Sequence, residues 1–263
     1  MLSLLNTDFL TDLLLLNACL IACFAWIYHN YFHLMDRLEA ITVTAKFLDE
    51  KQKVLLKRYF GYYNKLSPNL QRIFEQKLLY FYYTKEYQTV LDLELHERMK
   101  LFISAYAAQV SLGFRGYGFS HIYKIRIYPG KFYSHTKQEV SCWELDSEGV
   151  LHLSWKDFFG QMRREVLLPL GLEIMAHAIK KDENELLKDQ IYSSRNLLFQ
   201  QLSASDPAAA VRQLFAEEDL MSREDFMEAC IKNYFGCPTE LKNNFPDLFK
   251  KIDKLLFSQL RLG

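Results

Sequence analysis

The sequence lacks an excess of charge of either sign. Its 32 Lys and Arg residues balance 32 Asp and Glu residues, so the formal net charge at pH 7 is zero. Nonspecific nucleic-acid binding depends on a basic electrostatic field, which this composition does not supply. The aromatic residues, 15% of the chain, fall mostly at helical spacings, which predicts core packing and not base stacking. We therefore expect no direct nucleic-acid partner.

The chain is also poor in cysteine, with no CxxC pair. Two of the five cysteines lie inside an apolar N-terminal run, which leaves an odd set of three; the five are Cys19, Cys23, Cys142, Cys230 and Cys237. This pattern excludes a disulfide framework and a zinc knuckle, and it suits reduced thiols in the cytoplasm. No low-complexity linker or internal repeat marks a second globular domain.

The N-terminal run has no full charge over residues 13–32, LLLLNACLIACFAWIYHNYF. This is about the length that crosses a hydrocarbon core, and Trp26, Tyr28 and Tyr31 cluster at one end, as at a membrane interface. No Lys or Arg precedes it, which argues against a cleaved signal peptide. The run predicts a transmembrane helix. The alternatives are a buried or partner-binding helix and, at residues 20–23, a lipoprotein acylation signal.

Basic residues are placed after the apolar run and not before it. They are Arg37, Lys46, Lys51, Lys53, Lys57 and Arg58. Because basic flanks stay on the cytoplasmic side, we expect a single-pass protein of the cytoplasmic (inner) membrane whose C-terminal domain lies in the cytoplasm. The lipid bilayer is then a partner through residues 13–32.

The remaining sequence predicts an α+β domain that is mostly α, with a small β-sheet. We expect an anchor over residues 1–33, a helical stalk over 34–60 and one domain over 61–263. Strands are expected within residues 121–134, 139–145 and 149–154. Helices are expected over residues 67–81, 95–112, 156–181, 183–202, 207–217, 222–235 and 239–259. Ser67 and Pro68 are expected to start the first of these, because Ser is a good N-cap and Pro is favoured in the first turn. The residues expected to face inward from the second are Met99, Phe102, Ile103, Tyr106 and Val110.

Several motifs occur in an order that resembles one family of bacterial enzymes. They are YPGKF at residues 128–132, LSWKD at 153–157, a helix around His177, LSP at 66–68, LELHERM at 93–99, and a C-terminal segment over 225–238. In order and spacing they resemble the Mlc titration factor A family of zinc-dependent metallopeptidases, over approximately residues 60–250. The resemblance implies a zincin-like fold.

The resemblance also implies a metal site, which this sequence does not keep. Family members carry His-Glu-x-x-His on one helix and a third glutamate ligand on the C-terminal helix. Positions i and i+4 share one helix face, so both imidazoles reach one zinc ion, and the glutamate between them can activate a bound water. Here the motif is Glu173-Ile174-Met175-Ala176-His177, and Lys232 falls at the third-ligand position. No catalytic residue and no cofactor are therefore expected.

The changed residues suggest two pairing schemes. In one, Lys232 fills the space of the metal and pairs with Glu173 across the site, because buried charges need partners. In the other, each charge pairs along its own helix, Glu173 with His177 and Lys232 with Glu228, at i, i+4 spacing.

A metal-dependent alternative remains open. Glu173 and His177 are acceptable zinc ligands, and the nearest candidates for a third are Glu165, Asp182 and Glu183, although no spacing supports these three. The chain would then be a zinc-dependent peptidase of the same family with atypical ligands. A thiol nucleophile is not supported, because no histidine is placed beside Cys230 or Cys237.

The preferred hypothesis is a membrane-anchored, catalytically inactive member of the family that acts as a protein-binding or regulatory module. Its partner would be a cytoplasmic protein or peptide, bound as an added strand along an edge of the short sheet that contains residues 126–134. A purely architectural membrane protein is a further alternative.

Overall fold

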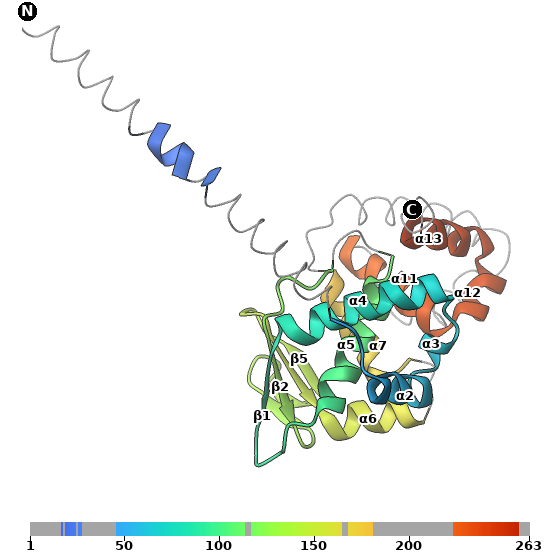
Figure 1. Ribbon diagram of the computed structural model, residues 1–263, viewed down its shortest axis with the longest axis horizontal. Coiled ribbons are helices and arrows are strands. Elements are labelled where there is room, and N and C mark those ends of the chain that lie inside the picture. The colour runs from blue at the N-terminus through green and yellow to red at the C-terminus, as the bar shows by residue number, and fades with distance from the viewer. Residues whose placement is uncertain are drawn as a thin grey trace, which may run out of the picture. The chain divides into compact units, whose positions relative to one another are not determined.

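The computed structural model describes residues 17, 19–24, 26–27, 46–113, 117–164, 168–180 and 223–257 (Figure 1). The chain divides into two compact units, Met1–Lys46 and Phe47–Gly263. Within the second unit the described elements form a mostly helical α+β domain with a small sheet, as the sequence predicts.

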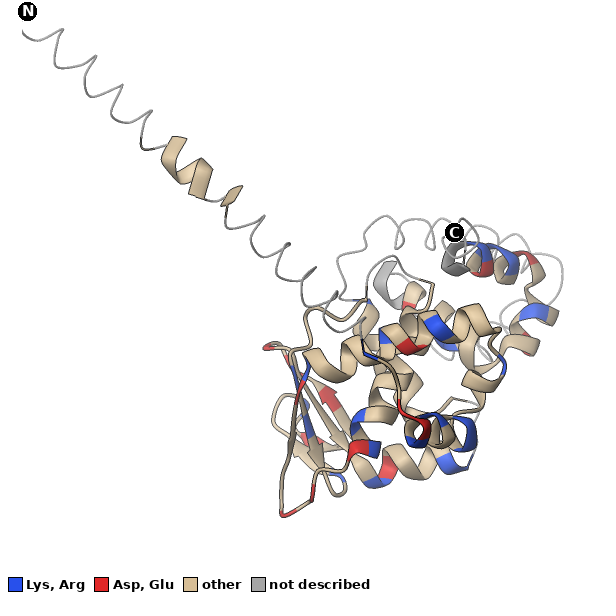
Figure 2. Ribbon diagram, viewed as in Figure 1, with Lys and Arg blue, Asp and Glu red and all other residues tan. Residues whose placement is uncertain are grey.

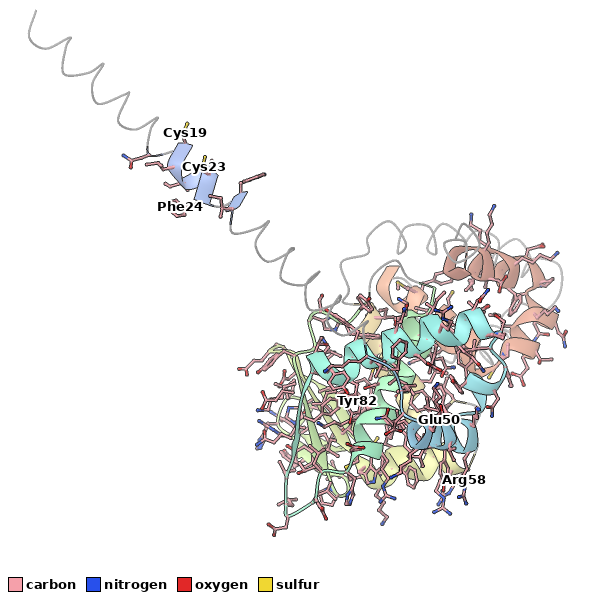
Figure 3. The ribbon with its side chains drawn as sticks, viewed as in Figure 1. Cys19, Cys23, Phe24, Glu50, Arg58 and Tyr82 are labelled. Atoms are coloured by element: carbon pink, nitrogen blue, oxygen red, sulfur yellow. The ribbon has the colours of Figure 1, made fainter. Side chains whose placement is uncertain are left out.

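The described residues of the first unit are helical, except for Lys46 at its end. Cys19, Cys23 and Phe24 belong to this segment (Figure 3), and Phe24 is 71% exposed. Within the described residues, no helix has both the length and the apolar character needed to cross a bilayer. More than half of the predicted span, residues 13–32, lies outside the described residues, so the transmembrane anchor stays a prediction.

The second unit contains a four-stranded mixed sheet in the order β1-β2-β6-β5. Strand β1 (Glu86–Thr89) runs parallel to β2 (Lys124–Tyr128), which runs parallel to β6 (Val150–Ser154). Strand β5 (Trp143–Leu145) is antiparallel to β6 and forms the edge of this sheet. A second, two-stranded sheet pairs β3 (Phe132–Ser134) with β4 (Glu139–Ser141).

The topology places residues 126–134 in two sheets. Residues 126–128 belong to β2, which lies between β1 and β6, and residues 132–134 form β3, so the edges of the four-stranded sheet are β1 and β5. Strand β1 was not expected, because its sequence EYQT is short and polar and carries no hydrophobic signal for a strand. Its backbone pairs with that of β2 over residues 124–127.

Two helices form the centre of the domain, α4 (Pro68–Thr84) and α5 (Glu97–Ser111). Ser67 precedes α4 in an extended conformation and Pro68 takes the first turn, as predicted. The five residues predicted to face inward from α5 are all buried: Met99, Phe102, Ile103, Tyr106 and Val110. Because α5 is buried on nearly all sides, it is the core helix of the domain.

Helix α2 (Glu50–Tyr59) and the short α3 (Gly61–Asn64) precede these. Asp49 begins α2 with a capping box: its carboxylate accepts from the Gln52 amide at 2.6 Å, and the Gln52 side chain accepts from the Asp49 amide at 3.1 Å. Leu56 is fully buried and α2 contacts α5, although the sequence placed α2 in the stalk.

Two long predicted helices are interrupted in the structure. The segment 156–181 contains α6 (Trp155–Arg163) and α7 (Leu170–Ile179), with Pro169 at the start of α7. The segment 239–259 contains α12 (Pro238–Asn244) and α13 (Pro246–Phe257) after α11 (Arg223–Gly236). Proline has no backbone N–H to donate, so it disrupts the interior of a helix. The two breaks coincide with such prolines, Pro169 before α7 and Pro246 at the start of α13. The predicted helices 183–202 and 207–217 lie outside the described residues.

Candidate functional site

The helix of the degenerate motif, α7, packs tightly against the core. Its Gly171 lies against Tyr106 of α5, where an added Cβ would stand 2.2 Å from the ring atom Cδ2. Glycine therefore allows the backbone of α7 to approach α5 closely. This approach fixes the positions of Glu173, Ile174 and His177, which lie within the next two turns of the helix.

The edge strand β5 supplies a tryptophan to the same site. The Trp143 indole Nε1 donates to Glu173 Oε1 at 3.3 Å, and its ring meets the His177 ring edge-on, with centroids 5.1 Å apart. The Lys137 ammonium lies 4.8 Å from the Trp143 ring centroid. The motif residues Glu173 and His177 thus both contact one aromatic side chain.

The other side of the site is Glu228 on α11. Its Oε2 lies 3.0 Å from His177 Nδ1 and accepts from Lys180 Nζ at 2.8 Å, while its Oε1 accepts from Lys232 Nζ at 2.6 Å. Glu228 is only 9% exposed. Both of its carboxylate oxygens therefore have cationic partners.

Burial and these partners act on the pKa of Glu228 in opposite directions. Burial raises the pKa of the Glu228 carboxyl, but the hydrogen bonds from His177, Lys180 and Lys232 favour the charged form. Their combined effect lowers the pKa well below its usual range. Glu228 is therefore ionised at neutral pH.

The structure corrects the proposed pair across the site. Within the described residues no ion pair joins Glu173 to Lys232; Lys232 pairs with Glu228 at i, i+4, as the second pairing scheme expected, and Glu173 bonds to Trp143. The proposed Glu173–His177 pair is likewise replaced, because His177 bonds to Glu228. Glu228 lies one turn before Lys232 on the same helix, so its carboxylate is the nearer partner.

Glu228 is the residue of α11 that faces His177. Lys232 was assigned to the third-ligand position, yet the side chain of α11 that faces His177 is a glutamate, the residue type of the family's third ligand. The signal was present in the sequence, because Glu228 precedes Lys232 by one turn and shares its face.

The residue at the position of the general base has no acid–base function. Ile174 is 1% exposed and belongs to the core, as do its neighbours Met175 and Ala176. An alkyl side chain cannot take a proton from water.

The described side chains do not fit a zinc site of the family type. Among the residues that the structure describes, no three His, Cys, Asp or Glu side chains are grouped so that they could hold a metal ion. The lysines on Glu228 add positive charge where a cation would bind. The candidate ligands Glu165, Asp182 and Glu183 lie outside the described residues.

Two histidines of the sheet region have partners away from this site. His152 lies between the Tyr128 hydroxyl and the Asp146 carboxylate, at 3.2 Å from each, and the ring of His135 meets that of Tyr133. Burial raises the pKa of the Cys230 thiol, which opposes thiolate formation.

A helix that presents Glu173 and His177 beside an antiparallel edge strand, and opposite a glutamate, defines a metallopeptidase-like domain. The sequence model of the glucose-regulated metallo-peptidase M90 family matches residues 34–185, and the chain belongs to this family. The resemblance to the Mlc titration factor A family is thereby confirmed. The match ends before α11, so Glu228 and Lys232 lie beyond it. No curated protein matches the chain.

Proposed function

We propose that this chain is a non-catalytic member of its family, a protein-binding or regulatory module that has exchanged the zinc ion for an ion-pair network. The observation that carries this proposal is that the two carboxylate oxygens of Glu228 are bonded to Lys180 and Lys232. The buried Ile174 at the position of the general base supports it independently. His177 then serves as a structural partner of Glu228.

The partner we propose is a cytoplasmic protein segment that adds a strand to β5. The Ser154 amide donates to the Cys142 carbonyl, so residue 142 is hydrogen-bonded to β6. Along an antiparallel strand every second residue bonds to its neighbour strand, and the residues between them point their N–H and C=O groups the other way. Residues 143 and 145 therefore direct these groups away from β6. The Ser141 hydroxyl donates to the Trp143 carbonyl at 2.6 Å. Leu145 is therefore the position where an incoming strand would pair.

Membrane attachment is a separate part of this proposal. Residues 13–32 would span the inner membrane once, with the folded unit in the cytoplasm, on the basis of their apolar length and the basic residues that follow.

The zinc content of the full chain tests the loss of the metal site. Chain purified without chelator should contain far less than one zinc per molecule by plasma mass spectrometry. The variant Glu173→His with Lys180→Gln and Lys232→Gln should gain zinc, because it offers two imidazoles and an unpaired Glu228 carboxylate. The matched control adds His177→Ala to that variant and should lose the zinc again.

A zinc peptidase with atypical ligands is the second candidate. It is favoured by the 3.0 Å contact between His177 and Glu228, which keeps two potential ligands together. One zinc per wild-type chain, lost in His177→Ala, would establish this candidate and contradict the non-catalytic one. Adding Ile174→Glu to the zinc-binding variant would then ask whether peptidase activity appears.

A further inference from the structure

A group of arginines lies over aromatic rings where α2, α5 and α6 meet. The Arg58 guanidinium lies 5.2 Å from the Tyr59 ring centroid, and those of Arg98 and Arg163 lie 5.8 and 5.9 Å from that of Phe159. The two rings are themselves 6.0 Å apart. We call these five residues the arginine–aromatic surface.

The rings beneath the arginines are held by the core. Phe159 stacks on Trp155 with centroids 5.2 Å apart and an interplanar angle of 13°, and on Phe102 at 6.0 Å. Tyr59 meets Phe102 edge-on. The three guanidinium groups therefore rest on a rigid base, which reduces the conformational entropy that ligand binding costs.

The arginines carry charge that the described protein does not neutralise. All three are exposed, and within the described part of the chain none forms an ion pair with a carboxylate. Two acids of the same helices have other partners: Glu50 pairs with Lys53, and Asp157 accepts from Ser154. Glu97, next to Arg98, is exposed and forms no ion pair within the described residues. An aromatic ring does not neutralise a guanidinium, whose N–H groups match phosphate oxygens.

The same region exposes apolar side chains. Helix α2 carries four basic residues and one acidic residue in the sequence EKQKVLLKRY, seen as blue along the helix in Figure 2. Val54, 59% exposed, lies between Lys51 and Arg58 at helical spacing on one face, and Phe47 just before the helix is 83% exposed. Arg58 projects from the outer side of α2 (Figure 3). Basic and apolar residues on one helix face are typical of membrane-interface binding.

Chain connectivity also favours a lipid partner. Only residues 33–49 join the predicted span to α2, and even fully extended they reach at most about 60 Å. Nucleic acid is a poorer fit, because the rings that would stack on bases lie under guanidinium groups.

We propose that the arginine–aromatic surface binds the anionic headgroups of a phospholipid bilayer. It would hold the folded unit against the membrane face and fix its orientation there. This role does not require the apolar segment to span the bilayer, since charge and exposed apolar area give surface binding by themselves.

The test uses the full chain with vesicles of phosphatidylcholine alone or mixed with phosphatidylglycerol. Phenylglyoxal modifies exposed arginines, and peptide mass spectrometry reads the extent at each position. Modification of Arg58, Arg98 and Arg163 should fall at least about fivefold in the mixed vesicles, since each basic group favours an anionic surface by roughly that factor. Arg126 on β2 should react equally with both vesicle types. Equal reactivity of the three arginines in both vesicle types would overturn the proposal.

Variants supply a second measurement. Replacing Arg58, Arg98 and Arg163 together by Glu should abolish the phosphatidylglycerol-dependent part of vesicle binding, while the triple Arg→Lys variant should keep part of it. A control with the same charge change elsewhere, Lys65→Glu with Arg72→Glu and Lys242→Glu, should bind as the wild type does. Loss of binding in both triple Glu variants would contradict a localised surface.

Two further probes separate other sources of negative charge. Inorganic phosphate or poly-glutamate that protects the arginines as well as the mixed vesicles do would assign the surface to free anions or acidic proteins and overturn the proposal. Binding to pure phosphatidylcholine vesicles reports on residues 13–32 alone. Failure of the anchor is thus distinguishable from failure of the arginine–aromatic surface.

Discussion

Glu228 shows what a buried carboxylate requires at the scale of one residue. A charge removed from water costs free energy unless partners replace its hydration. Here three side chains replace it: His177 of α7, Lys180 at the C-terminal end of α7, and Lys232 of α11. Because Lys180 and Lys232 place positive charge on both carboxylate oxygens, the carboxylate can stay ionised. The two helices are then joined by ion pairs instead of shared metal ligands.

Replacing Glu228 by Gln should destabilise the fold by about 2 kcal/mol at pH 7, because two ammonium groups lose their carboxylate. The folded pKa of Glu228 is depressed, so its contribution is complete above the unfolded pKa of about 4.3 and declines as the pH falls toward the folded pKa. Urea unfolding of both proteins from pH 7 to pH 3 should therefore show the difference shrinking below about pH 4.

The exposed Glu139 on β4 provides the control for that measurement. Glu139→Gln should change stability by less than about 0.5 kcal/mol at pH 7. A difference between wild type and Glu228→Gln that does not vary with pH would contradict the ion-pair account.

At the scale of elements, the contact between α7 and α5 depends on the absence of one side chain. Gly171 meets Tyr106, which is 4% exposed and has little space to move. Sequence periodicity predicted both helices but not this contact, because a glycine within a helix gives no sign of what it faces. The break before α7 was visible as Pro169, yet the hydrophobic periodicity on either side favoured one continuous helix.

Gly171→Ala should destabilise the protein by about 1–3 kcal/mol, because its Cβ would overlap the Tyr106 ring and push α7 away from α5. Gly160→Ala on α6 is the matched control, since no atom lies within 4 Å of the added Cβ. That substitution should stabilise by about 0.5–1 kcal/mol through helix propensity. Thermal unfolding of both variants gives the comparison, and a shift of the same sign in both would refute the close-approach argument.

For the whole molecule, sequence reasoning succeeded where a pattern is local and failed where distant segments meet. The buried face of α5 follows from helical spacing, and the start of α4 follows from Pro68 in its first turn, although the Ser67 side chain makes no capping hydrogen bond. Strand β1 could not be predicted, because its polar residues are strand-like only beside β2. The contact of His177 with Glu228 joins positions 51 residues apart, and no spacing rule describes it. The family resemblance identified the helix of His177 but not its partner on α11, Glu228.

The relation of the chain to a membrane is a property of the whole molecule that the apolar run predicts. Full-length protein should stay with membranes after carbonate extraction, whereas Ile21→Arg with Ala22→Arg should be released, since each arginine near a helix centre costs about 2.5–3.5 kcal/mol of insertion free energy. Cys19→Ser is the control and should remain in the membrane.

Protease added to sealed right-side-out cells should leave the folded unit intact and digest it only after lysis, because the basic residues after the run favour a cytoplasmic position. Digestion before lysis would reverse the predicted orientation, and release of the unmodified chain by carbonate would favour surface attachment through Arg58, Arg98 and Arg163 over a spanning helix.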